Sequence, residues 1–292
     1  MPSLIINADD FGMTSGVNRA IADATRAGLL TSATMMANSR CFDDAVELSR
    51  KLPNLRVGCH VVLIDGEPVS HGLRSLLEPG HDGPPRFRHS LKAFALAAMR
   101  GKIAPEEIQQ EAEAQIRRIQ AAGIVVTHVD THKHTHMFPN VLRPVLRAAK
   151  ACGVRRVRNP FEASGSLPAS LIAGAPSLWT RTAEVALLRG YAVSFRKIVQ
   201  QEGMTTTQGA IGVIVTGMLD QKLLTKMVQR LSEGTWELVC HPGYVDDALR
   251  SSGTRLVESR QVELQALTSE ETRQALSSRG IQLVSFADLK EM

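Results

Sequence analysis

The sequence of 292 residues predicts a single α/β domain built as an irregular (β/α) barrel of seven to eight mainly parallel strands. Short apolar runs alternate with amphipathic helical stretches, a pattern typical of repeated βα units. Several of these runs are continuous and β-branched, as expected for strands buried on both faces. The alternative is a doubly wound open sheet. However, ADDFGM rather than a glycine-rich phosphate-binding turn follows the first predicted strand.

The predicted elements follow one another closely along the chain. The strands are expected at Leu4–Ala8, Ser32–Ala37, Arg56–Leu63, Ile124–Val129, Val154–Arg158, Ile211–Val215, Glu237–Cys240 and Ile281–Ser285. The helices with recognisable ends run from Val17 to Ala27, from Pro105 to Gly123, from Pro139 to Gly153 and from about Glu258 to Arg279. Proline at a helix start and glycine after its end indicate these bounds.

We expect one domain over residues 1–292, because the composition shows neither an internal repeat nor a linker. Residues 71–88 are rich in glycine and proline and predict a long loop. Residues 159–207 combine PFEASGSLPAS with an apolar stretch. Since long structureless loops are uncommon inside a compact domain, we interpret 159–207 as a lid or a small insertion.

Composition narrows the class of partner. The net charge of +5 is compatible with an anionic membrane surface, but only 4% of residues are aromatic and no basic aromatic motif supports nucleic-acid binding. The four cysteines are scattered, which is typical of a reducing compartment. The sequence shows no signal-peptide pattern and no apolar run approaching the roughly 18 residues of a spanning helix. We therefore expect a cytoplasmic protein.

The stretch VTHVDTHKHTHM is the densest group of metal-binding side chains. It holds four of the nine histidines, and His128, His132, His134 and His136 share even numbering with Asp130. In an extended chain this period of two sends all five side chains to one face. Imidazole and carboxylate are typical ligands of Zn²⁺ and related ions, so the stretch predicts one wall of a metal site. The alternative is a histidine-rich surface loop.

Polar residues also lie at or near the ends of several other predicted strands. Taken together they are Asn7, Asp9, Asp10, Asn38, His60, Asp130, His132 and His241. In a parallel barrel the active site forms at the carboxyl ends of the strands. Any one of these residues has a structural explanation, such as a helix cap or a paired buried histidine. Their convergence favours a metal site.

The chemistry of such a set is hydrolytic. One carboxylate and two imidazoles leave coordination positions open, and a bound cation lowers the pKa of water. The adjacent Asp9 and Asp10 point in different directions, so that one can ligate while the other accepts a proton. His241 is the candidate proton donor. Metal-assisted amide or ester hydrolysis is the predicted reaction, with a phosphoesterase or a non-catalytic metal- or sugar-binding protein as alternatives.

The ordered motifs NADDFGMTSGVNRAI, TSATMMAN, GCHVVL, THVDTHKHTHMFP and CHPG resemble those of the YdjC-like carbohydrate deacetylases, which include chitooligosaccharide deacetylases. The resemblance covers about Leu4 to Pro144 and returns at Val239–Tyr244. It implies an irregular (β/α) barrel, one divalent metal ion, and removal of acetyl groups from N-acetylated sugars.

By this resemblance Asp10, His60 and His132 are the metal ligands, Asp9 is the base, and His241 is a general acid or a transition-state donor. Zn²⁺ or Mg²⁺ is the expected ion, and Mn²⁺, Co²⁺ or Ni²⁺ would also be accommodated. A further set is expected to support the ligands or face the substrate, namely Asp130, His136 and Asn38. The remaining histidines of the tract, His128 and His134, are expected to be structural.

Within the family, GCHVVLIDGEPV and RVRNPFE look most like the branch associated with hopanoid biosynthesis. That branch implies an N-acetylglucosaminyl hopanoid as substrate, and therefore a peripheral contact with the inner face of the membrane. The alternative substrate is a soluble chitooligosaccharide.

Overall fold

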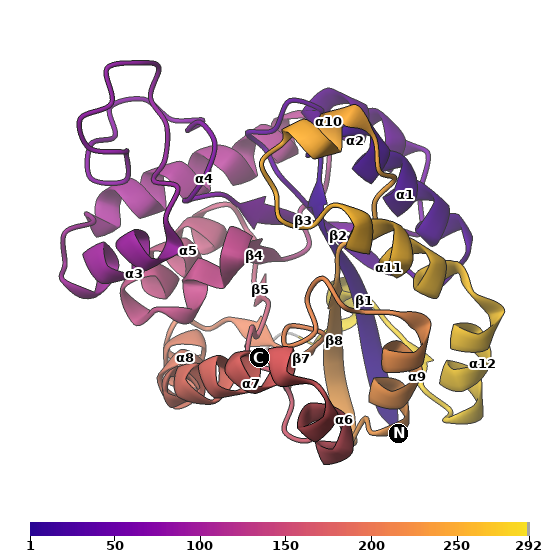
Figure 1. Cartoon of the computed structure of the whole chain (residues 1–292). Coiled ribbons are helices and arrows are strands. Elements are labelled where there is room, and N and C mark those ends of the chain that lie inside the picture. The colour runs from indigo at the N-terminus through magenta and orange to yellow at the C-terminus, as the bar shows by residue number, and fades with distance from the viewer. Residues whose placement is uncertain (291–292) are drawn as a thin grey trace.

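The computed structural model describes residues 1–290, which form a single α/β domain around a curled half-barrel of eight parallel strands (Figure 1). The strands are β1 (Pro2–Phe11), β2 (Ser32–Met35), β3 (Arg56–Val61), β4 (Val129–Thr131), β5 (Arg156–Val157), β6 (Thr205–Thr206), β7 (Ala210–Ile211), β8 (Gly234–Cys240) and β9 (Gln282–Leu283). Their order is β6-β5-β4-β3-β2-β1-β8-β7, and β9 pairs with β1 beside this path. Among residues 1–290 no ladder joins β6 to β7, so the barrel stays open there.

Helices surround the sheet. They are α1 (Ser15–Arg26), α2 (Phe42–Arg50), α3 (Leu91–Met99), α4 (Pro105–Ala121), α5 (Pro139–Ala151), α6 (Ala169–Gly174), α7 (Pro176–Leu188), α8 (Ala192–Gln201), α9 (Gln221–Gln229), α10 (Asp247–Ser251), α11 (Glu258–Thr268) and α12 (Glu270–Ser278). Short 3-10 turns are η1 (His132–Met137), η2 (Arg189–Tyr191) and η3 (Phe286–Asp288). No helix among the described residues is long and apolar enough to cross a membrane.

Strand β1 is the centre of the sheet. It pairs with β2 and β8 along its length and with β9 near its start, and every residue from Leu4 onward is buried. A strand with neighbours on both edges and helices over the sheet needs apolar side chains on both faces, which the run LII supplies. Its carboxyl end therefore lies next to those of β2 and β8, where predicted site residues gather.

Most predicted strands differ from the structure by a few residues at their ends, and three predicted elements differ in ways that have a clear physical reason. The strand predicted at Ile124–Val129 is wrong for its first part, because Val125 is 82% exposed and β4 begins only at Val129. The strand predicted at Ile211–Val215 ends at Ile211, where Gly212 turns the chain with φ of 98°. The single helix predicted from Glu258 is two helices. Ser269 breaks it with extended backbone, and its side chain caps α12.

Residues 159–207 are not a structureless loop. They contain α6, α7, η2 and α8, and their last residues form β6 at the edge of the sheet. Figure 1 shows α7 and α8 lying together along one side of the half-barrel. The function of this segment as a lid stays a prediction.

Candidate metal centre and active site

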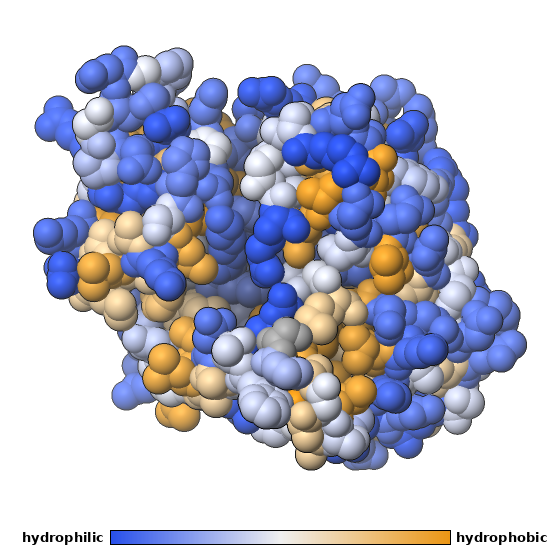
Figure 2. Space-filling view, in the orientation of Figure 1, coloured by the Kyte–Doolittle hydropathy of each residue, from blue (hydrophilic) through white to orange (hydrophobic). Residues whose placement is uncertain are grey.

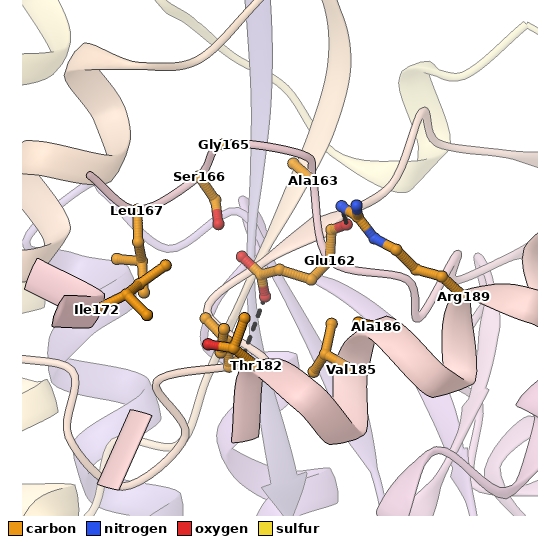
Figure 3. A pocket seen from close by; sticks show the side chains of 11 residues that line it. Glu162, Ala163, Gly165, Ser166, Leu167, Ile172, Thr182, Val185, Ala186 and Arg189 are labelled. Atoms are coloured by element: carbon orange, nitrogen blue, oxygen red, sulfur yellow. Dashed lines mark hydrogen bonds between the residues drawn. The ribbon is translucent and has the colours of Figure 1, made fainter. Parts of the chain in front are cut away.

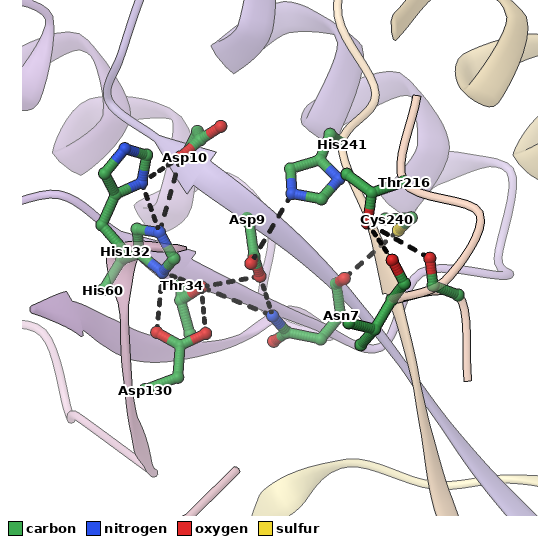
Figure 4. A network of polar contacts seen from close by, with 12 residues as sticks. Asn7, Asp9, Asp10, Thr34, His60, Asp130, His132, Thr216, Cys240 and His241 are labelled. Carbon is green, nitrogen blue, oxygen red and sulfur yellow. Dashed lines mark hydrogen bonds and ion pairs between the residues drawn. The ribbon is translucent and has the colours of Figure 1, made fainter. Parts of the chain in front are cut away.

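The site begins with an irregularity in β1. The pairing of β1 with β2 shifts register between Ala8 and Phe11, and Asp10 has a positive φ of 66°. A bulge of this kind re-aims side chains, and a strained non-glycine residue is typical of functional sites. It sends Asp9 and Asp10 toward different partners, as predicted (Figure 4).

Three potential ligand atoms converge beside Asp10. Its Oδ1 lies 3.5 Å from His60 Nε2 and 3.4 Å from His132 Nδ1, and these two nitrogens are 3.2 Å apart. Asp10 Oδ1 is buried and has no hydrogen-bond partner among the described residues. A buried carboxylate oxygen without a donor is costly, and a divalent cation would satisfy it. The donor set and the orphaned oxygen therefore fit the predicted metal ion.

His132 reaches this position by a turn rather than by an extended strand. After β4 ends at Thr131, the chain enters η1, and Lys133 and His134 both have positive φ, of 54° and 53°. The prediction that the whole histidine tract faces one way is therefore wrong. The turn brings His132 alone to Asp10, which agrees with the ligand set implied by the family resemblance.

A carboxylate orients His60. Its Nδ1 lies 2.7 Å from Asp130 Oδ1, which leaves Nε2 directed at Asp10. Burial alone would lower the pKa of His60, but the carboxylates of Asp130 and Asp9 raise it to about 9. A carboxylate behind a ligating imidazole sets its tautomer and orientation. Asp130 thus orients His60, one of the three candidate ligands.

Asp9 lies on the other side of the bulge and is held by Arg158. Two guanidinium nitrogens of Arg158 donate to its carboxylate over 2.8 and 2.6 Å, and Asn7 and Thr34 donate to Oδ1 over 3.0 and 3.2 Å. Burial would raise the pKa of Asp9, but Arg158 holds it well below its usual range. Asp9 is therefore ionised. His241 Nε2 lies 3.8 Å from its Oδ2.

Arg158 is a charged side chain of the interior that sequence reasoning missed. It is fully buried and also contacts the carboxylates of Asp130 and Glu237, the latter over 2.7 Å. One guanidinium thus links three carboxylates from β1, β4 and β8. The available signal was an arginine at the end of a predicted strand, within RVRNP. A buried arginine requires carboxylate partners.

Helix α11 provides two more residues that were not predicted. Arg260, fully buried, donates from Nη2 to Asp10 Oδ2 over 2.5 Å, which leaves Oδ1 as the free oxygen. Glu263 accepts the backbone N–H of His241 over 2.5 Å. The two residues are three positions apart and so share a helix face. A single helix therefore holds both a predicted ligand and the predicted proton donor.

His241 is mostly buried at the end of β8, which neighbours β1 on the edge away from β5. Figure 4 shows its ring directed at Asp9. Burial lowers its pKa to about 4, because the desolvation effect exceeds the opposing effect of Asp9. The ring is therefore neutral near pH 7 and can donate one N–H. Its Nδ1 lies 3.9 Å from Glu263 Oε2 and makes no hydrogen bond among the described residues.

The remaining predicted residues lie around this centre. Asn38, which follows β2, donates a hydrogen bond to the carbonyl of Glu67 over 2.8 Å. This bond links the loop after β2 to the loop after β3. His136 is fully buried and contacts the hydroxyl of Thr131 and the carbonyl of Arg158, so it supports β4 and β5 rather than facing a substrate. Burial lowers its pKa to about 3.

The other two histidines of the tract differ in their surroundings. His128 stacks on Phe286 with ring centroids 3.8 Å apart, and its Nε2 meets Asn7 Oδ1 at 3.2 Å. This is a structural position, as expected. His134 lies near His136, and its Nδ1 is buried without a hydrogen-bond partner among residues 1–290. Burial lowers its pKa well below the usual value.

A separate buried carboxylate, Glu162, faces the α7 residues Thr182 and Val185 across a pocket (Figure 3). It borders a pocket of about 130 Å³, and its Oε2 accepts the backbone N–H of Ile214 over 3.1 Å. Burial raises the pKa of Glu162 to about 7. The pocket is lined mainly by apolar side chains, among them Leu167, Ile172, Val185 and Ala186.

Comparison with known proteins decides the family. The sequence model of the family described as YdjC-like protein matches residues 3–278. The chain belongs to this family. A carbohydrate deacetylase from Brevibacillus brevis is 33% identical to this YdjC-like chain over 287 residues, which cover 98% of the chain and 99% of the relative. A solved structure from Enterococcus faecalis V583, described as a candidate cellobiose-phosphate cleavage protein, is 26% identical with a TM-score of 0.77, and covers 100% of this chain and 99% of that one.

Proposed function

We propose that this YdjC-like protein is a metal-dependent carbohydrate deacetylase that hydrolyses the acetamide of an N-acetylglucosamine-containing glycan or glycolipid. The observation that carries the proposal is the free, buried Oδ1 of Asp10 facing two imidazole nitrogens, with the second carboxylate of Asp9 beside it. The carbohydrate deacetylase from Brevibacillus brevis, 33% identical over nearly the whole chain, supports the same reaction.

The residues that would hold the cation are Asp10, His60 and His132. Two nitrogens and one oxygen favour Zn²⁺, Co²⁺, Ni²⁺ or Mn²⁺ over Mg²⁺, which prefers an oxygen set. When bound, the cation polarises the amide carbonyl and makes water acidic enough to attack it near neutral pH. Arg260 keeps the second oxygen of Asp10 occupied, so that the ligand oxygen stays in place.

In this proposal Asp9 takes a proton from the attacking water. Arg158 holds both oxygens of Asp9 and lowers its pKa, so Asp9 is ionised and fixed in direction, although it is a weak base. The water oxygen bonds to the acetyl carbon, the C–N bond breaks, and the amine leaves with a proton. His241, neutral at pH 7, donates an N–H hydrogen bond to the developing oxyanion, and the proton that Asp9 took from the water passes to the leaving amine.

The finer proposal concerns the substrate. The resemblance of GCHVVLIDGEPV and RVRNPFE to the hopanoid-associated branch favours an N-acetylglucosaminyl hopanoid. A soluble chitooligosaccharide is the alternative. Acetate release from both substrates, with and without a chelator, separates them. Equal rates on diacetylchitobiose and on the lipid-linked sugar would favour the soluble substrate.

The roles of the carboxylates are tested by Asp9→Asn. This variant is expected to bind metal normally but to release acetate at least ~10²-fold more slowly, because it lacks the general base. His60→Ala and His132→Ala are expected to lose both metal and activity. Full turnover by Asp9→Asn would show that Asp9 is not the base, and failure of the wild-type protein to take up any divalent metal would overturn the hydrolase proposal.

A further inference from the structure

Large exposed apolar side chains gather on two segments of the molecule. Among the described residues, Leu96 and Met99 on α3 are 44% and 52% exposed, and Leu187 on α7 and Val193 on α8 are 80% and 78% exposed. We call these four side chains, together with Tyr191 between the latter two, the apolar face. Figure 2 shows apolar residues beside the central hollow, over the region where Figure 1 places α3, α5 and α8.

The two segments form one continuous surface. The Tyr191 hydroxyl donates to Met99 Sδ at 3.6 Å, and the Tyr191 ring meets Phe138 edge-on with centroids 5.9 Å apart. A hollow of about 180 Å³ lies between them, lined by Met99, Phe138, Pro139, Asn140 and Tyr191.

The apolar face lies on the side where the site opens. Helix α5 begins at Pro139, directly after η1, which carries His132. A helix that follows a parallel strand begins near the carboxyl end of that strand, and the active site of this architecture lies at the same edge. Since Pro139 and Phe138 line the hollow of the apolar face, the face borders the entrance to the metal ligands.

The two segments that carry the apolar face are rich in cationic residues. Residues 83–105 and 185–201 contain no aspartate or glutamate. They carry five and three cationic residues, namely Arg86, Arg88, Lys92, Arg100 and Lys102 in the first and Arg189, Arg196 and Lys197 in the second. Asp82 and Glu106 flank the first segment in the sequence, and Glu184 and Glu202 flank the second. Two further acids, Glu78 and Asp65, contact His89 of the first segment. Glu202 is already paired with Arg143.

We propose that the apolar face docks onto an anionic lipid bilayer. Scattered apolar side chains ringed by lysine and arginine are typical of surfaces that rest at the headgroup level, where the cations meet lipid phosphates. A second copy of the chain is a poorer occupant, because two such faces would bring like charges together. Docking does not depend on the proposed function. If the substrate is a glycolipid, docking places its headgroup at the entrance to the site.

Co-sedimentation of the purified protein with vesicles tests the proposal. We expect binding to vesicles of phosphatidylglycerol and phosphatidylcholine, and at least tenfold weaker binding to phosphatidylcholine alone. The double variant Leu187→Glu/Val193→Glu is expected to bind anionic vesicles at least tenfold more weakly. Both side chains are largely exposed, so the fold does not depend on them. Lys92→Glu/Lys197→Glu should weaken binding similarly.

Matched controls lie elsewhere on the surface. Val125→Glu replaces an equally exposed apolar side chain, and Lys222→Glu removes a cation from α9; both should bind vesicles like the wild type. Acetate release from soluble diacetylchitobiose should be unchanged in every variant, which separates docking from catalysis. No binding by the wild type, or equal loss in the controls, would overturn the proposal. The proposal would also be overturned if the wild type is a dimer at micromolar concentration and Leu187→Glu/Val193→Glu is a monomer, because the apolar face would then bind a second copy of the chain.

Discussion

Replacing Arg260 with methionine tests how the buried charges of the candidate metal centre balance one another. The guanidinium of Arg260 contacts Asp10 Oδ2 at 2.5 Å, and both side chains are buried. Methionine keeps much of the volume but leaves Asp10 without this counter-charge. Removing one partner of a buried ion pair costs about 3–5 kcal/mol of unfolding free energy. For a domain of this size that corresponds to a fall in Tm on the order of 10 °C.

The expected loss depends on the metal. A divalent cation beside Asp10 Oδ1 supplies positive charge that the variant lacks, so the deficit of Arg260→Met should be largest with EDTA and smaller with zinc. Urea unfolding of both proteins under both conditions measures this difference. The control is Arg273→Met on α12, whose side chain is 45% exposed and which should change stability by less than about 0.5 kcal/mol. An equal deficit with and without metal, or a loss no larger than the control's, would refute the reasoning.

Two further predictions concern single carboxyl groups. Asp130→Asn should weaken metal affinity by about 10–100-fold, because His60 loses the carboxylate that orients it; calorimetric titration measures this, and unchanged affinity contradicts it. Glu162→Gln should change the pH dependence of stability. Burial raises the folded-state pKa of Glu162 from 4.5 to about 7, so its contribution is fully present below pH 4.5 and is lost as pH rises through 7. Between these pH values the unfolding free energy of the wild type should therefore fall by on the order of 3 kcal/mol more than that of Glu162→Gln. Urea unfolding at pH 4.5 and pH 8 measures this difference. If the unfolding free energy changes by the same amount in both proteins, the prediction is contradicted.

Much of the fold could be predicted because local patterns determine it. The continuous apolar run of β1 requires burial on both faces, and the structure places this strand between β2 and β8. Gly28, Gly123 and Gly153 end helices, as expected, each with a positive φ. The bounds of β4 and the break at Ser269 could not be predicted, because apolar periodicity continues through both positions while the backbone turns.

The candidate site, too, could be predicted only in part from the sequence. Residue type and order, together with the family resemblance, named Asp10, His60 and His132, and these three converge in the structure. The even spacing of the tract wrongly predicted that all its histidines face one way. Positive φ angles at Lys133 and His134 decide their directions, and these angles have no signature in hydrophobic period.

The sequence by itself determined the fold class and the family and named three candidate ligand residues, because strand patterning and motif order are properties of neighbouring residues. Only the tertiary structure decided which charges compensate one another. Arg158 joins carboxylates from three strands, and Arg260 reaches Asp10 across 250 positions of the chain. Pairing of buried charges depends on distance in space and on the exclusion of water, and neither is written in the local order of residues.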